Sequence, residues 1–213
     1  HIAINKGLEM ANGSYFLVID SDDYLLQNVI NILLKYVKRL KDKKQFAGFT
    51  FIRFMERTPY NPNNYGHKEW VNDQPYEWEF HGEMSFCYKT EIARHFPFPQ
   101  FEGEKFCPES IVHRRIAKNY DVLFTDHVLA SGEYLQDGLS SKYNQLMEKS
   151  PRAGLLSYAE KIGDSKNNKN LRKQFAKNYW DLAIKAPQIT WIERFCAIPL
   201  SLSIWYWKNR LLK

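Results

Sequence analysis

Three carboxylates stand within four positions, directly after a short apolar run. Residues 15–19 read Tyr-Phe-Leu-Val-Ile, and Asp20, Ser21, Asp22 and Asp23 follow. An apolar run this short and this rich in β-forming residues predicts a buried strand. Carboxylates at a strand's end lie at the edge of the sheet where open α/β proteins bind ligands. Crowded carboxylates repel one another, so we expect a positive group among them, and Mg²⁺ or Mn²⁺ prefers such oxygen ligands.

A second interpretation of the same cluster is structural. Asp, Ser and Asn after a strand commonly form turns and helix N-caps. On this interpretation Asp22 or Asp23 caps a helix that starts near Tyr24. The choice between a metal site and a helix cap depends on the neighbouring sequence.

The apolar pattern predicts the elements that would position these side chains. The order helix, strand, helix, strand over the first 54 residues predicts a parallel α/β unit. Residues 56–74, rich in Pro, Asn and Tyr, are predicted to form a long surface loop. The expected helices are residues 1–11 with Asn12-Gly13 as the C-cap, about 24–40, 90–95, 108–119 and most of the chain after Lys142. The expected strands are 15–19, 46–54, 122–124 and 128–134, with a strand pair near residues 75–88.

Charge is divided unevenly along the chain of 213 residues. Residues 1–141 hold 16 Lys and Arg against 19 Asp and Glu, a net charge of −3. Residues 142–213 hold 14 against 5, a net charge of +9. A basic C-terminal third suits anionic lipid headgroups or nucleic acid, and no nucleic-acid-binding signature is present. We therefore expect a membrane surface as partner and no nucleic acid.

The cysteines indicate the redox compartment of the protein, and the hydropathy bears on whether a helix spans a membrane. Cys87, Cys107 and Cys196 are odd in number and widely spaced, so neither a zinc site nor a disulfide framework is indicated. A reducing compartment fits this pattern best. No run of eighteen apolar residues is present, so no membrane-spanning helix is expected.

Several further segments carry a family resemblance. The segments are Asn5-Lys6-Gly7, Ala11-Asn12-Gly13-Ser14-Tyr15, Asp20-Ser21-Asp22-Asp23, residues 101–109 and residues 134–140. Together they resemble the nucleotide-sugar glycosyltransferases of family 2, of the bacterial surface-polysaccharide type. The resemblance covers roughly residues 1–143. It implies a GT-A (Rossmann-like) mixed sheet flanked by helices, with an N-terminal truncation, because family members carry about two βα units before this point. The chain is accordingly expected to be the C-terminal part of a longer protein.

The resemblance implies a domain division and a reaction. Residues 1–141 would form the glycosyltransferase domain and residues 142–213 a basic amphipathic helical extension. The reaction would transfer a sugar from a nucleotide-sugar donor to a hydroxyl of a glycan or lipid-linked acceptor, with inversion. Asp20, Asp22 and Asp23 would bind Mn²⁺ or Mg²⁺ and the diphosphate; which of them ligates the metal directly is left open.

An inverting transfer also needs a base that takes the acceptor proton. The candidates are Glu102, Glu104 and Glu109. The resemblance favours Glu109, which follows Pro108 at the start of a helix, and Glu104 is the second choice. The structural alternative is that Glu109 only complements the helix dipole. Family members often carry Glu-Asp at this position, whereas this chain has Glu109-Ser110.

The remaining expected site residues fall into three groups, each with an ordinary structural alternative. Asn5 and Lys6 would lie near the nucleotide, and Arg115 would contact the diphosphate. A turn with Asp137, Gly138 and Ser140 would cover the leaving group. Trp78 and His81 would line the acceptor site, since sugars stack on aromatic rings.

The C-terminal segment contains both aromatic and basic residues. Residues 190–213 include Trp205, Tyr206 and Trp207, followed by Lys208, Arg210 and Lys213. Such a segment suits a helix that lies in a membrane interface. The alternative is a helix packed on the catalytic domain or on a second subunit. The expected location is the cytoplasm, peripheral on the inner face of the plasma membrane.

Two other functions compete with this reaction. One is a non-catalytic GT-A-like module, or an inactive fragment. The other is a nucleotidyltransferase on a similar sheet, which Glu109 and the 137–140 segment disfavour.

Overall fold

The computed structural model describes residues 1–27, 29–55, 68–71, 83–132 and 142–212. Contacts divide the chain into two compact units. The first, here called the sheet unit, comprises residues 3–97 and 112–138. The second, here called the helical unit, comprises residues 1–2, 98–111 and 139–213. The predicted division at 141/142 stays a prediction.

Within the described residues, the strands of the sheet unit form one mixed sheet of seven strands, in the order β1-β5-β3-β6-β4 with β7 beside β3 and β2 beside β7. Their bounds are β1 (Tyr15–Leu17), β2 (Asp23–Leu25), β3 (Phe46–Met55), β4 (Glu69–Val71), β5 (Glu83–Lys89), β6 (Asp121–Thr125) and β7 (Val128–Gly132). The predicted α/β fold with a mixed sheet is confirmed, and it is consistent with a GT-A fold.

Strand β3 is the centre of this sheet. It pairs antiparallel with β5 on one side and parallel with β6 and then β7 on the other. The parallel register shifts once between β3 and β7: Ile52 pairs with Val128, and the next residue, Arg53, pairs with Ala130. Such an irregularity changes which residues face one another beyond it.

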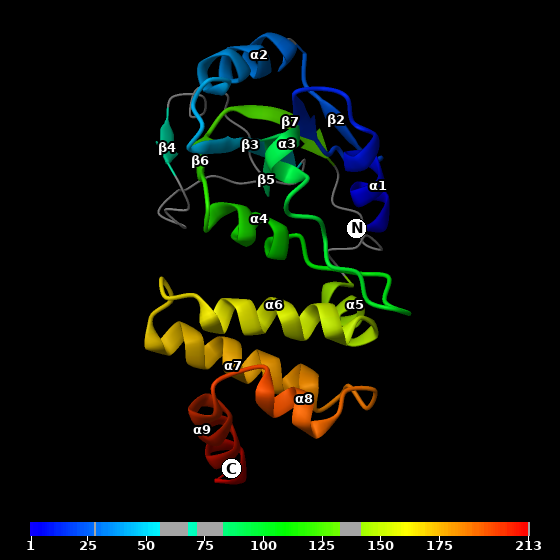
Figure 1. Cartoon of the computed structure of the whole chain (residues 1–213), viewed down its shortest axis with the longest axis vertical. Helices are drawn as coiled ribbons and strands as arrows, with labels where there is room; N and C mark the ends of the chain where they lie inside the picture. Colours follow the sequence, from blue (N-terminus) through cyan, green and yellow to red (C-terminus); the bar gives the residue numbers. More distant parts are fainter. Residues whose placement is uncertain (28, 56–67, 72–82, 133–141, 213) are drawn as a thin grey trace. The chain divides into compact units, whose positions relative to one another are not determined.

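Helices α2 (Val29–Leu40) and α4 (Ser110–Ala117) lie on opposite faces of the sheet (Figure 1). Tyr36 of α2 stacks on Phe49 of β3 at 5.1 Å between ring centroids. His113 of α4 stacks on Phe86 of β5 at 3.7 Å. Phe86 is the neighbour of Cys87, which pairs with Phe49, and successive strand residues point to opposite faces.

The start of α2 corrects the predicted helix at Tyr24. Residues Asp23–Leu25 form β2, which pairs antiparallel with β7, and the helix begins only at Val29. Strand pairing with β7 therefore overrides the helical periodicity that begins at Leu25. Neither Asp22 nor Asp23 is at the helix N-terminus, so the capping interpretation is wrong.

A second correction lies within the loop predicted for residues 56–74. Glu69–Val71 forms β4 and pairs antiparallel with β6. Two side chains of α2 hold Glu69 in place: Tyr36 and Arg39 donate hydrogen bonds to its carboxylate at 2.9 and 2.5 Å. These contacts across the sheet unit explain a strand that local sequence does not indicate.

Helix α1 (Ile2–Met10) ends just before the expected Asn12-Gly13 cap, and Gly13 does not have the positive φ of a glycine cap. The guanidinium of Arg94, after α3 (Thr90–Ala93), donates to the carbonyl oxygens of Leu8 and Ala11 at 3.2 and 2.5 Å. A cation that donates to the last carbonyls satisfies a helix C-terminus as well as a glycine turn does.

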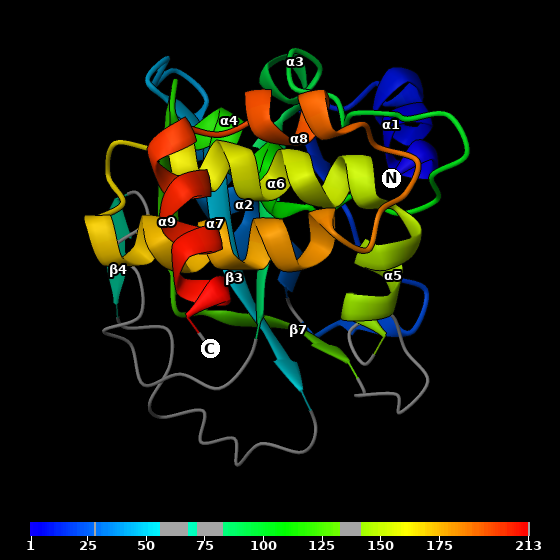
Figure 2. The same ribbon diagram turned by 90° about the horizontal axis from the view of Figure 1, so that it is seen from below.

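The helical unit confirms the helices expected after Lys142. They are α5 (Tyr143–Lys149), α6 (Pro151–Gly163), α7 (Lys169–Ala183), α8 (Trp191–Cys196) and α9 (Leu200–Leu211). Helices α6 and α7 pack side by side (Figures 1 and 2). Trp180 of α7 is fully buried, and the rings of Phe195, Tyr206 and Trp207 surround it at 4.7–6.0 Å between centroids. Part of the aromatic content of the tail is therefore core.

Candidate functional site

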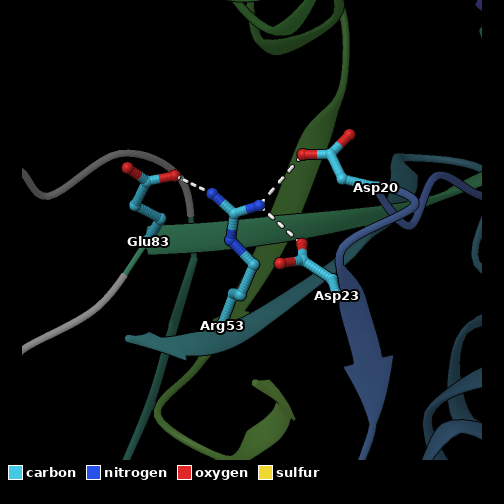
Figure 3. A network of polar contacts seen from close by, with 4 residues as sticks. All are labelled: Asp20, Asp23, Arg53 and Glu83. Carbon is cyan, nitrogen blue, oxygen red and sulfur yellow. Dashed lines mark hydrogen bonds and ion pairs between the residues drawn. The ribbon is translucent and has the colours of Figure 1, made fainter. Parts of the chain in front are cut away.

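The positive group among the carboxylates is Arg53 of β3 (Figure 3). Its Nη1 lies 3.0 Å from Asp20 Oδ2 and 2.5 Å from Asp23 Oδ2. Its Nη2 donates to Glu83, the residue that pairs with Arg53 across β5. The positive group expected among the carboxylates is therefore a residue of the protein, Arg53.

A turn between β1 and β2 brings the two aspartates to Arg53. The amide of Asp23 donates to the carbonyl oxygen of Asp20 at 3.0 Å, which closes the turn. The side chain of Asp23 is 5% exposed, whereas that of Asp20 is 58% exposed. Asp22, also in the turn, is exposed. The turn therefore offers one carboxylate to the interior and two toward solvent.

Space for the Asp23 carboxylate comes from Gly132 on β7. The two residues are register partners. A Cβ at position 132 would stand 2.0 Å from Asp23 Oδ1, far inside van der Waals contact. Only glycine leaves this space open, so Gly132 belongs to the site although it has no functional group.

The electrostatics of this cluster, here called the Arg53 network, favour the charged form of Arg53. Burial lowers the pKa of Arg53, but its hydrogen bond to Asp23 and the charges of Glu83 and Asp23 outweigh burial, so the pKa lies above its ordinary value. One guanidinium faces three carboxylates, which leaves a net charge of −2. A further cation would be attracted to the exposed side of Asp20.

The residues present fit a divalent cation only in part. Within the described ranges, no three His, Cys, Asp or Glu side chains are arranged to hold a metal ion. Mg²⁺, however, is commonly held by one or two carboxylates together with substrate phosphates and water. Asp20 and Asp22 supply exposed carboxylate oxygens of that kind. The metal-binding role of Asp20, Asp22 and Asp23 stays a prediction.

Two expected nucleotide-binding residues share α1. Asn5 is buried (8% exposed), whereas Lys6 is exposed and pairs with Glu9 at 2.9 Å. Arg115 is half-buried on α4, on the sheet unit's part of that helix. Their proposed contacts with the donor remain untested.

The two candidate bases differ clearly in environment. Glu109 is exposed and directly precedes α4. Glu104 is 9% exposed and accepts hydrogen bonds from the backbone amides of Arg152 and Ala153 at 2.7 and 2.9 Å. Both its oxygens are thus committed to the N-terminus of α6, where negative charge is stabilised. These contacts favour a structural role for Glu104 and leave Glu109 as the proposed base.

Other expected site residues lie outside the described residues. They are Asp137, Gly138, Ser140, Trp78 and His81.

Sequence reasoning missed Arg53, Glu83 and Gly132. A signal for Arg53 was available: it is the one charged residue in the otherwise apolar strand Phe46–Met55. A charge in a buried strand needs a partner, and the carboxylates after the first strand were the obvious candidates. Gly132 gave no such signal, because its role depends on strand register.

Residues 1–97 match the family described as glycosyl transferase family 2. The match includes all four residues of the Arg53 network but not Gly132, and it supports a family 2 glycosyltransferase domain in this part of the chain. No curated protein matches the chain. Among the helices in the described ranges, none is both long and apolar enough to cross a membrane.

Proposed function

We propose that the protein transfers a sugar from a nucleotide-sugar donor to a hydroxyl of a glycan or lipid-linked acceptor in bacterial surface-polysaccharide synthesis. The observation that carries the proposal is the Arg53 network at a strand end, inside the segment that matches family 2. Glycosyl transfer in general is supported by the family match, and the donor, acceptor and stereochemistry belong to the proposal.

The side chains divide the work of an inverting transfer. The acceptor oxygen forms the new bond to the anomeric carbon, the bond from that carbon to the diphosphate oxygen breaks, and Glu109 takes the acceptor proton. Asp20 and Asp22 would hold Mg²⁺ or Mn²⁺, which when bound offsets the charge on the leaving diphosphate. Arg53 fixes Asp20 and Asp23 in place, so the carboxylates need not reorganise when the donor binds.

Further contacts complete the proposed donor and acceptor sites. Asn5, Lys6 and Arg115 would bind the nucleotide and diphosphate. The segment with Asp137, Gly138 and Ser140 would cover the leaving group, and Trp78 and His81 would contact the acceptor sugar.

The proposed location is the cytoplasm, at the inner face of the plasma membrane. Free cysteines support a reducing compartment: Cys87 and Cys107 are buried and Cys196 is exposed. Burial raises the pKa of the Cys87 thiol to about 12, so this thiol is unreactive.

The test is nucleotide-sugar hydrolysis or transfer with Mn²⁺ and a panel of UDP- and GDP-sugars. We expect activity that Asp22→Ala and Glu109→Gln each abolish, with donor binding retained in Glu109→Gln. A protein that binds no nucleotide sugar, or that keeps its activity without these carboxylates, would instead be a non-catalytic GT-A-like module.

A further inference from the structure

The last two helices expose an unusual number of large apolar side chains. Ile192 of α8 is 76% exposed, and Leu211 at the end of α9 is 80% exposed. Leu200, Ile204 and Leu211 follow one another at spacings of four and seven, so they share one face of α9. The exposed set is Trp191, Ile192, Leu200, Ile204, Leu211 and Leu212, here called the tail face.

The two helices of the tail face are in contact. Trp191 of α8 lies 6.3 Å from the half-buried Trp207 of α9 between ring centroids. The opposite side of α9 is already used, because Tyr206 is buried against the core of the helical unit. The exposed side is therefore not the side that the fold needs for its own packing.

The charged side chains of α9 are both basic. Lys208 and Arg210 are exposed beside Leu211. The only carboxylate of residues 190–213 is Glu193. It is engaged in a capping box with Thr190 and pairs with Arg152 at 3.3 Å. An apolar face with a cationic border is complementary to an anionic lipid surface.

We propose that the tail face docks on an anionic lipid membrane. Trp191, Ile192 and Leu211 enter the headgroup boundary, while Lys208 and Arg210 contact acidic headgroups. The proposal stands independently of the sugar-transfer reaction, since it concerns only where the protein binds.

The test is co-sedimentation with vesicles of phosphatidylcholine, with and without phosphatidylglycerol. We expect binding only when phosphatidylglycerol is present, and weaker binding at high salt. The double variant Ile192→Ser/Leu211→Ser should bind at least about tenfold more weakly. Lys208→Gln should bind about fivefold more weakly.

The matched control is Leu171→Ser, which removes an exposed leucine from α7 outside the tail face. It should bind vesicles as the unchanged protein does. Equal loss in the control, or equal binding to neutral vesicles, would overturn the proposal. The proposal would also be overturned if the tail face bound a second copy of the chain. That result would appear as a dimer that the double variant dissociates.

A second inference rests on Glu104 and on the proposed role of Glu109. Besides the two bonds from Arg152 and Ala153 to Glu104, the amide of Phe106 donates to Ser150 Oγ at 3.1 Å. The chain from Glu104 to Phe106 is thus fastened to the junction of α5 and α6.

Glu109 leaves this fastened stretch after two more buried residues, Cys107 and Pro108. Few backbone torsions separate the fastened residues from Glu109. We infer that Glu104 is a positioning residue, which holds the segment that presents the base.

Hydrogen exchange and kinetics test this inference together. Glu104→Ala should speed exchange at the amides of Arg152 and Ala153, and lower kcat about tenfold with the donor KM unchanged. Glu104→Gln keeps one acceptor and should recover part of kcat. Lys105→Ala, which removes an exposed side chain from the same stretch, is the control and should change neither readout.

If Glu104 were the base, Glu104→Gln would be as inactive as Glu104→Ala, because an amide takes no proton. Unchanged exchange at both amides would also overturn the inference. Failure of the proposed function would look different: Glu109→Gln would stay active while the exchange at Arg152 and Ala153 still responded to Glu104→Ala.

Discussion

Asp23 and Glu104 are both buried carboxylates, yet their negative charges are balanced in different ways. Asp23 faces the full charge of Arg53, which it shares with Asp20 and Glu83. Glu104 faces two backbone amides at the start of a helix. Around Arg53, three carboxylates face one cation, and the carboxylate of Asp20 is exposed to solvent. At Glu104, each oxygen of a single carboxylate accepts a backbone hydrogen bond. The comparison shows that burial alone does not distinguish the two carboxylates; the charge of the groups around each one does.

The largest expected effect on stability is at Asp23, because its partner Arg53 carries a full charge. Asp23→Ala should lower the free energy of unfolding by about 3 kcal/mol, because it leaves a mostly buried guanidinium with fewer partners. Glu104→Ala should cost about 1–2 kcal/mol, since it leaves only helix amides unpaired. Urea denaturation of both variants measures the difference. Equal losses would show that the two carboxylates are balanced equally well.

Gly132→Ala tests the space that Asp23 occupies. The added Cβ would displace the Asp23 carboxylate, so we expect a loss of about 1–3 kcal/mol and lower transfer activity. Thermal unfolding and the transfer assay measure the two effects. Gly163→Ala is the matched control, because no atom lies within 4 Å of its Cβ position. A Gly132→Ala protein as stable and active as the control would contradict the packing argument.

His113 adds a half-buried side chain that is neutral rather than charged. Burial lowers its pKa from 6.5 to about 4, and its Nδ1 lies 3.0 Å from the Tyr88 hydroxyl. The unfolded chain then binds the extra proton first as the pH falls. Stability should therefore be unaffected above about pH 6.5 and fall toward pH 4, at up to about 1.4 kcal/mol per pH unit.

The His113→Gln variant should lose this part of the acid sensitivity, as measured by denaturation at a series of pH values. An unchanged pH profile would show that groups other than His113 cause the acid sensitivity.

Lys6→Ala should have the smallest effect on stability. Its ion pair with Glu9 joins two exposed side chains, so the free energy of unfolding should change by less than about 0.5 kcal/mol. The donor KM should rise if Lys6 contacts the nucleotide. Glu9→Ala breaks the same pair and should leave the donor KM unchanged. An unchanged KM in both variants would remove Lys6 from the proposed donor site.

Local sequence predicted what depends on neighbours in the chain. The apolar runs located β1 and β3, and the basic, periodic C-terminal third predicted the helices α5 to α9. The carboxylates after β1 were recognised as a charged cluster that needs a cation. The fold class followed from these elements and from the family resemblance.

The rest depends on contacts between residues far apart in sequence. Arg53 meets Asp23 across 30 positions, and Arg152 donates to Glu104 across 48 positions. Arg94 caps α1 from more than 80 residues away, which is why the expected glycine cap is not needed. A single sequence carries no measure of such distances, so these partners were missed.

The register shift beside Arg53 has a consequence for insertions and deletions. From Ala130 onward, β7 runs one residue ahead of β3, and this offset sets Gly132 opposite Met55 on one side and Asp23 on the other. Removal of a residue near Leu129 would shift the register of β7 by one residue. Every later side chain of β7 would then point to the opposite face of the sheet. A residue with a Cβ would then come to the place beside Asp23. The strand should accept changes of side chain far more readily than changes of length.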